Sequence, residues 1–304
     1  MWSIVKLATI CLALSAATPA RADLKVATAL EDLASVAQFV GGEHVTAFSL
    51  CKGYEDPHFV PAKPSLMRAI RNADVFVSVG LELDGGWLPM VLPGSRNPKI
   101  QPGARGFVDA SDGVSVLEKP TGTVSRAEGD VHPLGNPHYY LDPLNLKVVA
   151  DHLADVFSKL DPANAAEYAE NAKAFCGKID AKSAEWEKDM EPFKEMQIVT
   201  FHKNYDYFLA RFGLKLLATV ELKPGIPPTP RHLAETVEAM KKAGSKVVLY
   251  QPYQDSNACE LLARKAGATA LEVPSEVGGV SRAGDVFAKF DFIVASLVKA
   301  LATK

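Results

Sequence analysis

Histidine is the residue type of this chain whose placement carries the most chemical information. The sequence has 304 residues and seven histidines. Three of these, His58, His138 and His202, lie in loops that follow predicted β-strands. Ligands of open α/β sheets bind beyond the carboxyl ends of the strands, and neutral imidazole is a good ligand for zinc and related transition metals. The three histidines therefore predict a metal site shared by loops that are far apart in the sequence.

Two of these histidines stand in nearly the same local sequence. His58 follows Asp56-Pro57, and His138 follows Asn136-Pro137. Proline fixes its own φ and restricts the residue before it, so each loop loses less entropy when the histidine is held in place. Aromatic residues flank all three histidines, and we expect them to form an apolar wall that excludes competing water; they are Phe59, Tyr139, Tyr140, Phe201, Tyr205 and Tyr207.

The elements that must position these loops alternate along the chain. The residue pattern predicts β-strands at 24–28, 45–50, 75–79, 106–110, 197–201, 215–220, 246–251 and 268–273. It predicts helices at 30–40, 64–73, 143–160, 205–212, 230–243, 256–266 and 285–301. Strands that alternate with helices are typical of parallel sheets covered by helices. The predicted fold class is therefore α/β, with two parallel-sheet lobes.

A single long helix is predicted between the two halves. Large apolar residues recur at helical spacing from Tyr168 to Phe193, which indicates one helix of about 30 residues with a single apolar stripe. We expect this connecting helix, at 161–194, to join the lobes rigidly. The N-terminal lobe would then occupy 23–160 and the C-terminal lobe 195–304.

The first 22 residues have the features of a secretory signal peptide. Lys6 precedes an apolar stretch at 7–17, and a small-x-small cleavage site follows at 20–22. We expect residues 1–22 to be removed before Asp23, leaving a soluble periplasmic protein.

Composition and cysteine content exclude other classes of protein. The formal net charge is −3 and no basic block occurs, so nucleic acid is not an expected partner. Cleavage would leave three cysteines, Cys51, Cys176 and Cys259. An odd number allows at most one internal disulfide, and we expect buried free thiols, since cysteine often packs as a small apolar residue.

Four segments of the mature chain together resemble a known family. Segments 56–61, 136–143, 201–208 and 221–228 are similar to motifs of the periplasmic metal-binding proteins of ABC-type zinc and manganese uptake systems. The second of these, Asn-Pro-His-Tyr-Tyr-Leu-Asp-Pro, is the most specific. The long connecting helix is also a feature of that family, and the resemblance covers essentially all of the mature chain.

This resemblance implies a function and a set of ligands. It implies a monomeric solute-binding protein that captures a metal ion between its lobes and delivers it to an ABC permease in the inner membrane. His58, His138 and His202 match the family's ligand positions. Manganese-binding members tend to have a carboxylate at the third position, so a histidine there indicates Zn²⁺, bound as the transported ligand. Because ligating imidazoles must be neutral, we expect the affinity to fall as the pH drops through about 6.5.

The sequence departs from the family pattern in two places. The family commonly supplies an aspartate as a fourth ligand after the last strand, but segment 273–279 contains none. We therefore expect either Glu276 or water in that position. Zinc-binding members often have a histidine-rich loop before the second motif, whereas the loop here has only His132, which is a candidate auxiliary ligand.

Two alternative functions use the same residues. Three histidines plus water also make a catalytic zinc site, so an exported mononuclear zinc hydrolase is possible on composition, with Glu276 or Asp206 as the general base. The sequence has no His-Glu-x-x-His and no Gly-x-Ser-x-Gly motif, and their absence favours a non-enzymatic protein. A metal chaperone or adhesin is the other alternative.

Overall fold

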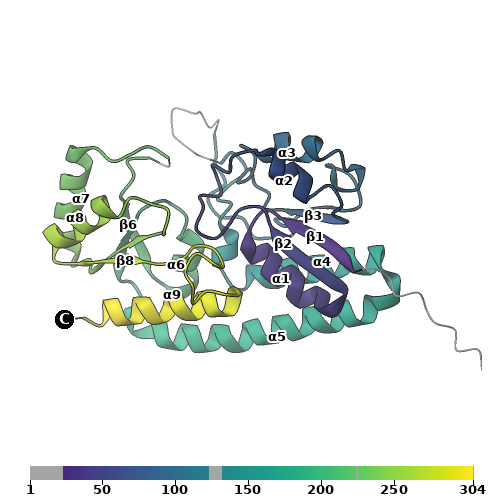
Figure 1. Ribbon diagram of the computed structural model, residues 1–304. Helices are drawn as coiled ribbons and strands as arrows, with labels where there is room; N and C mark the ends of the chain where they lie inside the picture. Colours follow the sequence, from purple (N-terminus) through teal and green to yellow (C-terminus); the bar gives the residue numbers. More distant parts are fainter. Residues whose placement is uncertain (1–22, 123–131, 224, 304) are drawn as a thin grey trace, which may run out of the picture.

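The computed structural model describes residues 23–122, 132–223 and 225–303. The predicted signal peptide therefore lies outside the described residues. Within them the chain forms two α/β lobes, each built on a four-stranded parallel sheet, with helices packed around the sheets (Figure 1). This confirms the predicted fold class.

The first lobe contains a sheet of strand order β2-β1-β3-β4. All three strand pairs are parallel, with Leu24 paired to Val45 and Phe76 to Phe107. The central strands are rich in valine and alanine, and they are buried at every position except Lys25 of β1, as expected for a sheet covered on both faces. Its strands are β1 (Leu24–Thr28), β2 (Val45–Ser49), β3 (Val75–Ser78) and β4 (Phe107–Asp109), and its helices are α1 (Glu31–Gly41), α2 (Pro64–Ala69), α3 (Leu88–Ser95) and α4 (Asn145–Leu160).

The second lobe repeats this arrangement with the order β6-β5-β7-β8. All of its pairs are also parallel. The carboxyl ends of parallel strands lie at one edge of a sheet, so the loops that follow them gather there. Its strands are β5 (Gln197–Thr200), β6 (Lys215–Thr219), β7 (Val247–Tyr250) and β8 (Thr269–Glu272), and the helices after them are α6 (Asp206–Phe212), α7 (Pro230–Ala243), α8 (Ser256–Ala266) and α9 (Val286–Leu301).

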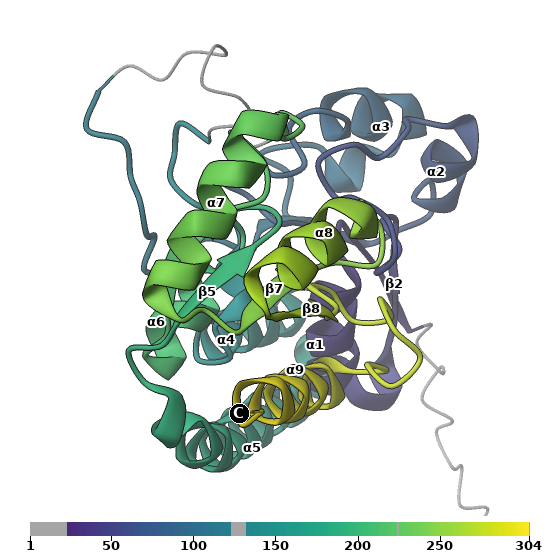
Figure 2. The same cartoon turned by 90° about the vertical axis from the view of Figure 1, so that its left-hand side faces the viewer.

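The predicted connecting helix is present as α5 (Ala165–Met190), which has 26 residues. At 1.5 Å per residue it is about 39 Å long, and single 3-10 turns extend it at both ends. The apolar residues of its stripe, including Tyr168, Phe175 and Trp186, are buried. Figures 1 and 2 show α5 running along both lobes with α9 beside it.

The C-terminal helix α9 links both lobes to the long helix. Phe287 lies 5.4 Å from Phe175 of α5 and 6.1 Å from Phe39 of α1, measured between ring centroids. Farther along, Phe290 stacks against Trp186 at 5.2 Å. One apolar core therefore continues from the first lobe through α5 into α9. The division of the chain into 23–160, 161–194 and 195–304 stays a prediction.

One difference from the predicted elements is at α2, which ends at Ala69 rather than at residue 73. The amide of Asn97 explains the early end, because its Nδ2 donates hydrogen bonds to the carbonyls of Ile70 and Ala73 at 3.0 and 2.8 Å. A side chain from another segment therefore binds the carbonyls of the turn that follows α2.

Candidate metal centre

The structure brings the three predicted ligands together. The ring centroids of His58, His138 and His202 lie 5.1 to 5.5 Å apart. Within the described part of the chain they form the one group of possible ligands whose donor atoms all lie within 4.8 Å of one another. His58 follows β2, His138 follows β4, and His202 lies two residues after β5. The strand ends of both lobes thus face one centre.

The repeated Asx-Pro-His sequence has a structural function. The Asp56 Oδ1 atom accepts from the backbone N–H of His58 at 3.0 Å and lies 2.8 Å from its ring Nδ1. Asn136 Oδ1 makes the same two contacts with His138, each at 3.0 Å. One side-chain oxygen in each motif therefore fixes both the backbone and the ring of the histidine two residues later. We identified these motifs by their prolines and did not predict the role of the Asx oxygen.

The third histidine is oriented by a residue that follows the neighbouring strand of its own lobe. His202 Nδ1 lies 2.7 Å from Oε2 of Glu221, which follows β6. The same oxygen accepts from the backbone N–H of Gly225 at 3.2 Å. The sequence analysis quoted Glu221 as part of a family segment but gave it no role. The sequence did offer one signal for this role. Glu221 follows β6, which is the neighbour of the strand that precedes His202.

These contacts leave the same nitrogen free in all three rings. When Nδ1 donates to an oxygen, the neutral ring presents the Nε2 lone pair on its other side. Burial lowers the pKa of His138 well below its usual value, and the neighbouring histidines lower it further. Burial raises the pKa of Asp56, but hydrogen bonds and the charge of His58 outweigh it and leave this pKa below its usual range. The site therefore offers a neutral donor at His138 and an ionised carboxylate behind His58.

Replacing Glu221 with glutamine tests this outer contact. The amide can still accept from His202, but it removes the charge that makes the ring a better donor. We expect Glu221→Gln to weaken zinc binding about 10- to 100-fold, the usual cost of losing an outer partner of a metal ligand. Competitive zinc titration would measure the change. Glu235→Gln, at an exposed ion pair with Arg231, is the control, and equal affinity of Glu221→Gln and wild type would contradict the expected role.

Glu276 lies in the predicted loop, but the structure does not bring it into the histidine group. Its side chain is buried and accepts from the Tyr140 hydroxyl at 2.9 Å and from the Ser275 hydroxyl. Burial raises the pKa of Glu276 to about 8, and the charge of Asp32 adds to the effect. A carboxyl that is held by two hydroxyls and favours its neutral form is a poor metal ligand. The sequence placed Glu276 in the loop after the last strand, but it did not show that the hydroxyls of Tyr140 and Ser275 donate hydrogen bonds to it.

Glu276→Gln is expected to change stability and to leave zinc binding unchanged. The folded pKa of about 8 lies above the ordinary value of 4.5. The unfolded chain therefore loses this proton first, and stability that is complete below about pH 4.5 declines as the pH rises toward 8. The slope is at most about 1.4 kcal/mol per pH unit. The neutral amide removes this loss, so the melting temperature of the variant should exceed that of wild type by more at pH 8.5 than at pH 5.0.

The same variant separates the two roles of this residue. Unchanged zinc affinity would agree with the hydrogen-bonded position of the carboxyl, whereas a loss as large as that of a histidine ligand would restore Glu276 as the fourth ligand. A pH-independent difference in melting temperature would show that the Glu276 carboxyl does not titrate as described.

His132, the predicted auxiliary ligand, lies beside the site. Its ring centroid is 5.4 Å from that of His58 and 6.1 Å from that of His138. Burial lowers the pKa of His132 to about 3, and the charges of His58 and His202 contribute. The loop is anchored at its end by Gly135, whose φ is +110°. A Cβ atom there would lie 2.4 Å from the Val116 side chain, so this close approach requires glycine.

The predicted aromatic wall is only partly present. Tyr139 and Tyr140 are buried, and the Tyr139 hydroxyl donates to the Val79 carbonyl at 2.9 Å. Phe59 differs, because 63% of it is exposed. The buried Trp87 takes the inner position at this loop instead, and its Nε1 donates to the Pro57 carbonyl at 3.0 Å. Nothing in the sequence connected this tryptophan with the site.

The remaining candidates lie outside the group. His44 pairs with Glu167 at 3.0 Å, and His232 Nε2 contacts the Thr219 carbonyl at 2.9 Å. Asp206, a base in the hydrolase alternative, lies near the Asn136 amide at 3.4 Å. The three described cysteines are free; Cys51 and Cys259 are buried, as predicted, whereas Cys176 is half-buried.

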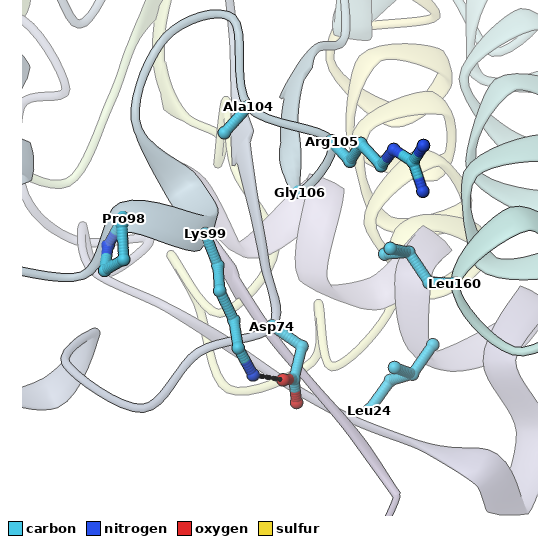
Figure 3. Close-up of a pocket in the computed structure, with 8 residues that line it drawn as sticks. All are labelled: Leu24, Asp74, Pro98, Lys99, Ala104, Arg105, Gly106 and Leu160. Carbon is cyan, nitrogen blue, oxygen red and sulfur yellow. Dashed lines mark hydrogen bonds and ion pairs between the residues drawn. The ribbon is translucent and has the colours of Figure 1, made fainter.

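A separate pocket of about 430 Å³ lies at the opposite end of the first sheet (Figure 3). It is lined by residues at the amino ends of the strands, such as Leu24 and Gly106. Its acidic residue, Asp74, is paired with Lys99 at 2.7 Å. The pocket lies at the amino ends of the strands, whereas the histidine loops lie at their carboxyl ends. Its lining has no histidine or cysteine.

Comparisons with known proteins agree with the geometry. A family model described as "Zinc-uptake complex component A periplasmic" matches residues 26–300. The chain is 33% identical over 115 residues to the high-affinity zinc uptake system protein ZnuA of Brucella abortus (strain 2308). The aligned residues make up 38% of this chain and 34% of the relative. The chain thus covers about a third of that relative's length. It is 26% identical over 264 residues to ZnuA of Paracoccus denitrificans, covering 76% and 77% of the two chains.

The solved structures support the fold. One described as "Crystal structure of ZnuA" superposes with a TM-score of 0.78 at 20% identity, covering 91% of this chain and 99% of that one. At this identity the match shows a shared architecture of two lobes and a long helix.

Proposed function

This chain belongs to the ZnuA family of periplasmic zinc-uptake components, and from that membership we propose that it is a solute-binding protein that captures Zn²⁺ between its lobes. It then delivers the ion to an ABC permease of the inner membrane. The ligands in this proposal are His58, His138 and His202. Zinc is the cargo here, so the site must both hold the ion and release it.

The convergence of the three histidine rings carries the proposal. Each ring comes from a different loop, and its Nδ1 contacts an oxygen of Asp56, Asn136 or Glu221. Loops separated by so many residues have no folding reason to gather three imidazoles whose Nε2 atoms are left for a ligand. Imidazole suits zinc and copper, whereas manganese prefers oxygen donors. This donor set supports zinc over manganese.

The lobes are tied together beside the site, which favours binding by local ordering of loops. The Tyr207 hydroxyl, from the second lobe, donates to the Asn136 carbonyl at 2.8 Å and accepts from the Leu117 N–H at 2.9 Å. Nearby, Arg211 makes two hydrogen bonds with Asp142, at 2.9 and 2.8 Å. We propose that the ligand loops tighten around the ion and that the permease recognises this filled form.

Location and assembly form part of the same proposal. We propose that residues 1–22 are removed before Asp23 and that the protein acts in the periplasm as a monomer. In the described residues, no helix has the length and apolar character needed to cross a membrane. Membership in a family of uptake components argues against the hydrolase alternative. A chaperone or adhesin would use the same three histidines.

Metal titration of the protein from residue 23 onward tests the proposal. Competitive titration with zinc, manganese and copper should give one tight zinc site and weak manganese binding. Zinc affinity should fall between pH 7.5 and 5.0, because protons compete for the ligands. Since the pKa of His138 is lowered, protonation of this ring contributes little to the decline. Manganese preference would contradict the assigned donors, and turnover of ester or phosphate substrates would support the hydrolase instead.

A further inference from the structure

Three buried ring nitrogens at the site have no hydrogen-bond partner. Among the residues that the structure describes, the Nε2 atoms of His58, His132 and His138 are buried without a partner. Leaving a buried polar atom unsatisfied costs about 1–3 kcal/mol. Three such atoms in one place therefore indicate that something binds there. His58 and His138 are already assigned to the metal, but His132 has the same property and no assigned role.

The position of His132 resembles that of a ligand. Its ring is 5.4 Å from His58 and 6.1 Å from His138, whereas the three assigned rings are 5.1 to 5.5 Å apart. A turn holds it in place, because the Gly135 N–H donates to the His132 carbonyl at 3.1 Å. By contrast, Nε2 of His44 is already paired, with Glu167.

The three histidines provide fewer donors than a closed zinc site usually has. Zinc in closed protein sites is almost always four-coordinate and tetrahedral, but the compact group contains three histidines. Glu276 is held by the hydroxyls of Tyr140 and Ser275. With Glu276 engaged elsewhere, the fourth position is open to water or to another side chain at the same centre.

We propose that His132 is the fourth zinc ligand, so that the ion is held by four imidazole nitrogens. This inference rests on the proposed function and adds to it a reason for selectivity. A site of four nitrogen donors has no hard oxygen ligand, so it disfavours manganese more strongly than three histidines and a carboxylate or water would. His132 lies outside the group of donors within 4.8 Å, so its ring must move closer when zinc binds.

X-ray absorption at the zinc edge tests this ligand directly. In the zinc-loaded protein, four imidazoles should scatter at about 2.0 Å. In His132→Ala the fit should give three imidazoles and one oxygen. Zinc affinity should fall about tenfold or more, because the weaker ligand water replaces an imidazole. His44→Ala, which removes a histidine away from the site, is the matched control and should retain four imidazoles.

The outcomes separate this inference from the proposed function. If wild type and His132→Ala give the same imidazole count, His132 is not a ligand, even though the protein still binds zinc. A second zinc ion that binds through His132, with three imidazoles at the first ion, would also overturn the inference. If His138→Ala binds zinc as tightly as wild type, the proposed site itself is wrong.

Discussion

Replacing His138 with alanine is expected to lower the zinc affinity more than any other single substitution at the site. His138 is the most deeply buried of the three histidines, at 2% exposure, and Asn136 holds both its backbone and its ring. Losing an outer partner costs 10- to 100-fold, so losing this preorganised ligand should cost more than about a hundredfold. Competitive titration with a zinc chelator would measure the loss.

Two further variants define the comparison. His132→Ala should weaken binding far less than His138→Ala, because the His132 ring lies farther from the centre of the group. His44→Ala should match wild type, since His44 pairs with Glu167 away from the site. Comparable losses for His138→Ala and His44→Ala would mean that zinc does not bind at the three histidines.

Replacing Lys289 with methionine is expected to destabilise the protein by about 3–5 kcal/mol, the usual cost of leaving one charge of a buried pair without its partner. The side chains of Lys289 and Asp32 form an ion pair with no exposed surface. Lys289 also donates to the carbonyls of Tyr140 and Ser275, at 3.4 and 3.3 Å. Methionine fills a similar volume but leaves the buried Asp32 carboxylate without its cation, although the Val277 N–H still donates to it at 2.9 Å. Urea unfolding followed by tryptophan fluorescence would measure the change.

The control for this prediction is an exposed ion pair. Arg231 and Glu235 pair on α7 with most of both side chains exposed, so Arg231→Met should leave the stability close to that of wild type. Combining Asp32→Asn with Lys289→Met should recover part of the loss, because no unpaired charge remains. A small effect of Lys289→Met alone would mean that water reaches Asp32 in the folded protein.

The sequence predicted the secondary structure well because periodicity is a local property. Strand β1 (Leu24–Thr28) and helices α7 (Pro230–Ala243) and α8 (Ser256–Ala266) begin and end where predicted. Each of these helices is followed by a glycine in the left-handed conformation, Gly244 or Gly267, which is a strong local signal for a helix end. Helix α2 was predicted too long because Asn97, distant in sequence, determines its end.

The sequence could predict the part of the site that follows from the positions of the strand ends. His58, His138 and His202 follow three strands, and parallel sheets place such loops together. The contact of Glu221 could have been inferred from its place after the neighbouring strand, whereas the contact of Glu276 with Tyr140 joins residues 136 positions apart. One carboxyl contacts the ring of His202 and the other pairs with hydroxyls, yet both are loop glutamates in the sequence.

The ion pair between Asp32 and Lys289 also constrains the order in which the protein folds. The two residues are 257 positions apart, and contacts of such long separation form slowly, because closing the chain between them costs entropy. The Asp32 carboxylate, in the first helix, gains its partner only when the last helix has been synthesised. We therefore expect the first lobe to complete its core only after the last helix has been synthesised. Such late closure would keep the chain incompletely folded during synthesis, which suits the export that we propose.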